Sequence, residues 1–230
     1  PLEIRIDGGP IAVTMRTPGH DDELALGFCL SEGLPARAAR VPDDLAANTI
    51  EVLVDGPFDR QAVERNFYTS SSCGVCGKGA LEAVAVSAAP VASDLRVPLE
   101  LVARLPEALR EEQATFEATG GLHGTGLFDE RGDLLCVRED VGRHNAMDKV
   151  IGWAHGAGLL PLTRSILCVS GRLSFELVQK AAVARCPLLV AVGAPSSLAV
   201  ELAQDRGVTL CGFVRGGTAN VYTEPWRLEV

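Results

Sequence analysis

The second half of the chain alternates short apolar runs with helical patterns, and this rhythm restricts the fold more than any other feature. The apolar runs are SILCVSG, LLVAVG and VTLCGFVRGG, which begin at residues 165, 188 and 208. Between them lie SFELVQKAAVARC and SSLAVELAQD, which have the length and apolar spacing of helices. Strands that are apolar throughout and alternate with helices are typical of a sheet covered on both faces. We therefore expect a mainly parallel sheet between helices, an α/β fold.

The rest of the chain predicts a smaller α+β part. Alternating residues around Gly8 and Gly9 predict a hairpin over 1–19, followed by a helix over 20–33 and a strand over 49–56. Residues 98–121 have a helical pattern that we expect to be interrupted near Pro106. Further on, residues 126–140 predict a strand, a turn and a strand, and residues 142–155 predict a helix. We divide the chain into an N-terminal α+β domain, 1–115, and a C-terminal α/β domain, 116–230.

Charge and composition argue against several classes of function. The chain has 30 acidic residues against 21 lysines and arginines, a net charge of −9, whereas a nucleic-acid binder needs a basic face. It has no run of about 20 apolar residues, the length that a membrane span requires. Its first residues also lack the basic and then apolar layout of a signal peptide. We expect a cytoplasmic protein that binds neither nucleic acid nor membrane.

Seven cysteines fall into two groups. Five stand alone in apolar surroundings, which predicts small buried hydrophobes rather than a disulfide framework: Cys29, Cys136, Cys168, Cys186 and Cys211. The other two, Cys73 and Cys76, form a C-x-x-C in SSSCGVCGKG, residues 70–79.

The C-x-x-C pair has several interpretations. Structural zinc needs four ligands, and this chain has one such pair, so a zinc site requires a dimer that pools two pairs. Zinc deaminase chemistry needs H-x-E, which does not occur in the sequence. A redox dithiol is the usual role of C-x-x-C in a cytosolic protein, but there it follows a strand within a β-α-β unit. A thiolate nucleophile fits the polar, glycine-rich surroundings, where Lys78 would lower a thiol pKa.

Glycines and arginines follow the predicted strands of the second half. We expect one shared rim made of Ser170-Gly171-Arg172, residues 193–196 and Arg215-Gly216-Gly217. Such turns and the helix N-termini beside them suit phosphate groups, and arginine is a fork-shaped donor to phosphate oxygens. Ordinary turn glycines with solvated arginines would give the same spacing. The sequence has neither a Walker loop nor G-x-G-x-x-G.

A second polar stretch is REDVGRHNAMDK, residues 138–149. A helix start explains its acidic residues. The triplet Arg143-His144-Asn145 is explained less well, and we expect it to point toward the rim. His123, which comes just before a predicted strand, is a minor candidate.

Taken together, several segments resemble one known family. They are VTMRTPGHDDELALGF, CGVCGK, TGGLH, REDVGRHNAMDK, SGRLSFELVQKAA, APSSLAVELA, CGFVRGG and NVYT, which run in order along essentially the whole chain. They look like the formate dehydrogenase accessory sulfurtransferases.

The resemblance implies a homodimeric cytoplasmic protein that takes persulfide sulfur from a cysteine desulfurase. The sulfur would pass to the Mo-bis-molybdopterin guanine dinucleotide cofactor before this enters apo formate dehydrogenase. The C-terminal part would have a cytidine-deaminase-like three-layer α/β/α fold, and no structural metal is expected. The alternative is a non-catalytic chaperone for the molybdenum cofactor.

The resemblance also assigns residues. Cys73 would carry the persulfide, with Cys76 as its partner. The cofactor-binding run would be Phe213, Val214, Arg215, Gly216, Gly217 and Thr218. Beside that run, we expect Arg172 to hold phosphate, and we propose that His144 assists proton transfer to or from sulfur.

Overall fold

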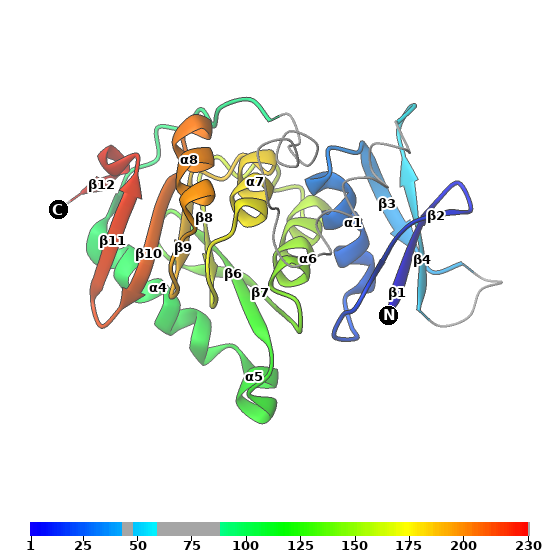
Figure 1. Ribbon diagram of the computed structural model, residues 1–230, viewed down its shortest axis with the longest axis horizontal. Coiled ribbons are helices and arrows are strands. Elements are labelled where there is room, and N and C mark those ends of the chain that lie inside the picture. The colour runs from blue at the N-terminus through cyan, green and yellow to red at the C-terminus, as the bar shows by residue number, and fades with distance from the viewer. Residues whose placement is uncertain (43–47, 59–87, 230) are drawn as a thin grey trace.

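A four-stranded sheet forms the N-terminal part of the computed structural model, which describes residues 1–42, 48–58 and 88–229. Its strand order is β2-β1-β4-β3 (Figure 1), with β1 at Leu2–Ile6, β2 at Gly9–Thr14, β3 at Ala36–Arg40 and β4 at Thr49–Val54. The expected hairpin over 1–19 is β1 with β2, and its turn places Asp7 and Gly8 at φ 52° and 71°. Helix α1, Asp21–Ser31, packs its buried side chains on this sheet. The predicted hairpin, the helix predicted over 20–33 and the strand predicted over 49–56 are confirmed. Strand β3 was not predicted.

The second sheet has six strands in the order β11-β10-β9-β8-β6-β7. The bounds are β6 His123–Asp129, β7 Leu134–Asp140, β8 Ser165–Val169, β9 Leu188–Ala191, β10 Thr209–Arg215 and β11 Thr218–Thr223. Strands β8, β9 and β10 are parallel, but β6 is antiparallel to both β8 and β7, and β11 is antiparallel to β10. The expectation of a mainly parallel sheet is therefore wrong. A parallel pair needs a long crossover, which only β8, β9 and β10 have, whereas a short turn reverses the chain.

Helices cover both faces of this sheet, as expected for three α/β/α layers (Figure 1). Helices α6 (Arg143–Gly156), α7 (Phe175–Val183) and α8 (Ser197–Arg206) share one core with the sheet, and α4 (Leu99–Glu111) shares another on the opposite face. Short elements complete the described chain: β5 (Val97–Pro98), α5 (Ala114–Thr119), η1 (Pro225–Arg227) and β12 (Leu228–Glu229). The predicted mixed α/β class is confirmed.

Helix α4 runs through Pro106 without a break, so the interruption expected there is wrong. The chain leaves the helix at Glu112 and Gln113 instead, and α5 follows until Gly120, which has φ 68°. The buried side chains of α4, including Val102, Leu105 and Leu109, bracket the proline, and their packing on the sheet offsets the backbone hydrogen bond that a proline cannot donate.

The two sheets are joined through helices α1 and α6, which pack directly against one another. A β-carbon at Gly27 would lie 1.8 Å from the carbonyl oxygen of Asp148, and one at Gly152 would lie 1.9 Å from that of Glu23. Only glycine allows backbones to approach so closely. Helix α4, which our division assigned to the N-terminal domain, lies on the six-stranded sheet, and the boundary at residues 115 and 116 stays a prediction.

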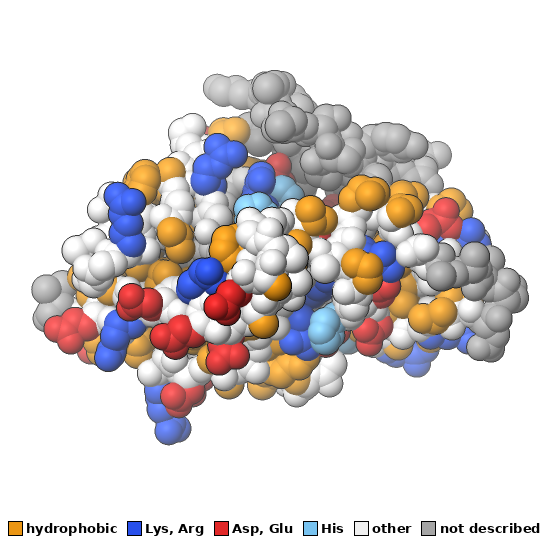
Figure 2. Space-filling view, turned by 90° about the horizontal axis from the view of Figure 1, so that it is seen from below, with side chains coloured by type: hydrophobic (Ala, Val, Ile, Leu, Met, Phe, Trp, Pro, Cys, Tyr) orange, Lys and Arg blue, Asp and Glu red, His pale blue; other side chains and the backbone are white. Residues whose placement is uncertain are grey.

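The described surface carries charges of both signs (Figure 2), and the isolated cysteines lie in the interior. Acidic and basic side chains are interleaved on the face seen in Figure 2, with no single basic field on it. Among the described residues, no helix is long and apolar enough to cross a membrane. The five isolated cysteines are buried, as expected. Burial raises the pKa of Cys136 to about 11 and that of Cys186 to about 12, so these thiols stay protonated and unreactive.

Candidate functional site

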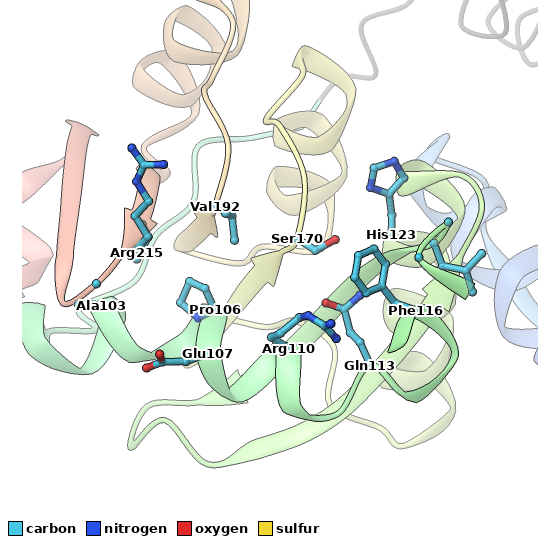
Figure 3. A pocket seen from close by; sticks show the side chains of 15 residues that line it. Ala103, Pro106, Glu107, Arg110, Gln113, Phe116, His123, Ser170, Val192 and Arg215 are labelled. Carbon is cyan, nitrogen blue, oxygen red and sulfur yellow. The ribbon is translucent and has the colours of Figure 1, made fainter. Parts of the chain in front are cut away.

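A pocket of about 540 Å³ lies at the carboxyl ends of the parallel strands, where the sequence placed the rim (Figure 3). Its volume is within the range of pockets that hold small molecules and cofactors. One wall comes from the strand ends and the other from α4, α5 and the segment that leads into β6. Its lining includes Arg110, Gln113, Phe116, His123, Ser170 and Arg215.

Backbone hydrogen bonds tie the strand-end turns together. Gly193 N donates to the carbonyl oxygen of Gly171 at 3.0 Å, and Phe213 N donates to that of Gly193 at 3.1 Å. A β-carbon at Gly193 would lie 2.8 Å from the same Gly171 oxygen, so this contact requires glycine. Ser170 Oγ accepts a hydrogen bond from Gly124 N at 2.9 Å, which joins the turn after β8 to β6. The predicted convergence of the three turns is confirmed, although Arg172 is not among the lining residues.

The segment 213–218 is the end of β10, a two-residue turn and the start of β11. Phe213 has φ 53° at an irregularity of the β10–β11 pairing, and its side chain is 41% exposed. Gly216 and Gly217 have φ 56° and 78°, the left-handed pair that a tight hairpin turn requires. Val214, Arg215 and Gly216 line the pocket, whereas Phe213, Gly217 and Thr218 belong to the same hairpin outside its lining. The turn places the Arg215 guanidinium at one end of the pocket (Figure 3).

The helical wall carries polar residues that the sequence did not single out. The Arg110 guanidinium lies 4.5 Å from the centre of the Phe116 ring, a cation–π contact. Gln113 is 2% exposed, and its Nε2 has no hydrogen-bond partner among the described residues. The break between α4 and α5 brings Gln113 into the wall. The nearby TGGLH, residues 119–123, was the sequence signal for this region.

His123 and His144 have different surroundings. His123 lines the pocket, and burial together with the charge of Arg143 lowers its pKa. His144 lies where α6 and α7 begin, with its Nε2 3.2 Å from Ser174 Oγ and 3.8 Å from the Glu176 carboxylate. It is not among the residues that line the pocket.

Two members of the triplet 143–145 have roles that the sequence did not predict. Burial first, and then the charges of Lys180 and Arg143, lower the pKa of His144 to about 4. Its imidazole is therefore neutral near pH 7 and available as a hydrogen-bond partner rather than as an acid. Asn145 points away from the rim, because its Nδ2 donates to Met15 O at 2.8 Å and to Asp140 Oδ1 at 3.1 Å.

The predicted thiols Cys73 and Cys76 lie outside the described residues. Within residues 1–42, 48–58 and 88–229, no three His, Cys, Asp or Glu side chains come together as a metal site would require.

The fold and the pocket define a three-layer α/β protein with a pocket at its strand ends. The model of the FdhD/NarQ family matches residues 1–229, and the chain belongs to that family. A relative from Streptomyces avermitilis, named sulfur carrier protein FdhD, is 49% identical across all of this chain and 87% of its own length. Relatives of the same name from Mycobacterium tuberculosis and Sulfolobus acidocaldarius are 49% and 44% identical, over 99% and 100% of this chain and 89% of each relative.

The fold comparison agrees. A crystal structure from Desulfotalea psychrophila, described as a formate dehydrogenase accessory protein, matches with a TM-score of 0.79 at 27% identity, covering 99% of this chain and 88% of that one. The resemblance expected from the sequence is confirmed: the chain belongs to a family of sulfur carriers that is linked to formate dehydrogenase.

Proposed function

We propose that this protein is a sulfurtransferase that carries persulfide sulfur on Cys73 and delivers it to the Mo-bis-molybdopterin guanine dinucleotide cofactor of formate dehydrogenase. The observation that carries the proposal is the match, over nearly the whole chain and at about half identity, to proteins named sulfur carriers. The C-x-x-C at 73–76 is the one place in this sequence where two thiols lie close together along the chain.

The chemistry balances with two thiols. The Cys73 thiolate attacks the outer sulfur of a persulfide on a cysteine desulfurase, and the donor cysteine leaves as its thiolate. Cys73 then holds a persulfide. Release as sulfide needs two electrons, which Cys76 supplies when its thiolate attacks Cys73 and forms a Cys73–Cys76 disulfide. A dithiol reductant then restores both thiols.

The cofactor is the substrate of this reaction, and the pocket at the strand ends is the proposed place for its guanine nucleotide end. Arg215 and Gly216 offer a cation and a backbone without a side chain at one end of the pocket. These groups suit a diphosphate. Ser170 and His123 line the same pocket and supply further polar groups.

Mass spectrometry after incubation with a cysteine desulfurase and cysteine tests the proposal. We expect a gain of one sulfur on the wild type and none on Cys73→Ala, while Cys29→Ala, which removes a buried thiol, still gains sulfur. An unchanged wild-type mass with cofactor still bound would favour the alternative, a non-catalytic cofactor chaperone.

Partners follow from the same proposal. A cysteine desulfurase gives the sulfur and apo formate dehydrogenase receives the matured cofactor, both in the cytoplasm, and the protein acts as a homodimer. Co-purification of each partner with the wild type, together with light scattering of the purified protein, tests these three statements.

A further inference from the structure

We propose that Gln113 recognises the guanine base of the bound nucleotide by donating a hydrogen bond from Nε2 to the carbonyl oxygen O6. This inference rests on the proposed function, because the ligand is the guanine nucleotide end of the cofactor. It assigns a specificity-determining role to a residue outside the predicted cofactor-binding run 213–218.

The first observation is an unsatisfied donor. Gln113 is 2% exposed, lines the pocket, and its Nε2 has no hydrogen-bond partner among the described residues. A buried amide without a partner is costly, and such groups are usually paired in a folded protein. Nε2 lies against Gly124 and is enclosed there. The terminal torsion of glutamine has broad energy wells, so a turn about the Cγ–Cδ bond, which exchanges Nε2 and Oε1, presents the donor to a pocket ligand that accepts a hydrogen bond.

The second observation is how the amide is held. It lies against Gly124 so closely that a β-carbon there would be 2.6 Å from both Cδ and Nε2 of Gln113. The absence of a side chain at residue 124 therefore makes room for the amide. Gln113 also holds the helix break in place, because its backbone oxygen accepts from Glu117 N at 3.0 Å.

The third observation is the flat surface beside the amide. The Arg110 guanidinium lies over the Phe116 ring at 4.5 Å, and both residues line the pocket next to Gln113 (Figure 3). A planar base stacks on such a guanidinium or aromatic face. Arg215 lies at the other end of the pocket, toward which the phosphates would extend. The pocket thus has the Arg110–Phe116 pair and the Gln113 amide at one end and Arg215 at the other (Figure 3).

A hydrogen bond to O6 distinguishes guanine from a base that lacks this oxygen. A site that donates to a carbonyl binds an analogue without it more weakly, because the donor is then left unpaired. Adenine is a poorer comparison, because the amide can turn Oε1 toward its amino group. We therefore expect binding to weaken when O6 alone is removed.

The test compares the affinities of two ligands for two proteins. Binding of GDP and of the diphosphate of 2-aminopurine riboside, which lacks O6, is measured by calorimetry on the wild type and on Gln113→Met. We expect the wild type to prefer GDP by about tenfold, the value of one hydrogen bond to a buried donor. In Gln113→Met that preference should fall to about one, since the methionine fills similar space without a donor.

Two further variants separate the hydrogen bond from other effects. Gly124→Ala pushes the amide aside without changing it, and we expect the same loss of preference. Ala114→Glu adds a charge at an exposed neighbour outside the pocket lining and should keep the tenfold preference. Thermal melting of each ligand-free variant confirms that it is folded.

Equal affinity of the wild type for the two ligands would overturn the inference, and so would an undiminished preference in Gln113→Met. Failure of the wild type to bind either nucleotide would overturn it as well. Sulfur loading of Cys73 by the desulfurase is measured on the same variants and should not change. Normal loading with lost base preference would leave sulfur transfer standing, whereas absent loading would count against the proposed function itself.

Discussion

Arg215 carries the positive charge at the strand-end side of the pocket. The Gly216–Gly217 turn fixes its place at the end of β10, and Thr218 Oγ1 donates to its backbone oxygen at 2.9 Å. Because its guanidinium would pair with phosphate oxygens, we expect Arg215→Gln to weaken GDP binding about tenfold and to leave guanosine binding unchanged. Titration with both ligands measures the difference.

The control for that change is Arg131→Gln, which removes an exposed arginine from the turn between β6 and β7. It removes one positive charge, as Arg215→Gln does, but lies outside the pocket lining. Equal weakening by the two variants would mean that Arg215 acts only through long-range charge.

The lowered pKa of His144 predicts that the stability of the fold depends on pH. Its pKa falls from an ordinary 6.5 to about 4, through burial first and then through Lys180 and Arg143, with Glu176 opposing. Between these values the unfolded chain binds the proton more readily than the folded one. The contribution of His144 to the free energy of unfolding is therefore complete above pH 6.5, and it is lost as the pH falls toward 4.

The measurement is urea unfolding of the wild type and His144→Gln at about pH 7 and about pH 4.5. The His144 side chain is 32% exposed, so solvent weakens the effect. We expect the wild type to lose about 1–2 kcal/mol more than the variant on acidification. Carboxylates that titrate in the same range are common to both proteins, and parallel losses would contradict the prediction.

At the residue scale, the sequence predicted the half of the pocket that comes from strand ends. Ser170 and Arg215 follow apolar strands, and parallel strands bring their carboxyl ends to one edge. The other half could not be predicted, because Arg110 lies in the upstream helix α4 and Gln113 just after it, and the packing of that helix depends on the completed sheet. His144 was expected near the rim, but the adjacent start of α7 supplies Ser174 as its partner.

At the element scale, the crossing of α1 and α6 depends on two glycines. A β-carbon at Gly27 or Gly152 would overlap the backbone of the other helix, at 1.8 and 1.9 Å. Backbone cannot move aside as a flexible side chain can, so we expect Gly27→Ala and Gly152→Ala each to lower the free energy of unfolding by more than about 3 kcal/mol. Chemical denaturation measures this.

Gly156 is the matched control, since it also lies in α6 but nothing is within 4 Å of the site of its β-carbon. Gly156→Ala should be neutral or stabilising by up to about 1 kcal/mol, because alanine has the higher helix propensity. If all three variants were equally stable, the close helix crossing would be wrong.

The sequence predicted the elements better than their directions. Apolar runs gave β8, β9 and β10 with the helices between them, but β6 and β7 have similar patterns and run antiparallel. Strand direction depends on the connection, and the β6–β7 and β10–β11 turns are short. Strand β3 was missed because its sequence, ARAAR, is rich in alanine and arginine, which have little strand preference.

At the scale of the whole molecule, polar contacts join the N-terminal sheet to the six-stranded layer. Glu23 of α1 accepts two hydrogen bonds from Arg138 of β7, at 2.5 and 2.7 Å. Asp140 and Lys149 are buried and paired at 2.8 Å, and Lys149 also donates to Thr17 O at 2.9 Å. Separation of the two parts would break the bonds of Arg138 to Glu23 and of Lys149 to Thr17, and it would expose the face of α1 that packs on α6.

We therefore expect the chain to unfold in one cooperative transition. Trp226 lies in the C-terminal part, whereas Trp153 lies beside Glu23 and Leu26 of α1. In a Trp153→Phe background, tryptophan fluorescence therefore reports on the C-terminal part, and far-ultraviolet circular dichroism reports on all secondary structure. In guanidinium chloride at one fixed protein concentration, the two signals should give coincident curves. Arg138→Met, which leaves Glu23 without its two bonds, should shift both midpoints down together. A circular dichroism transition at lower denaturant than the fluorescence change would show instead that the N-terminal sheet unfolds independently, because only a separately stable unit can melt while the tryptophan environment persists.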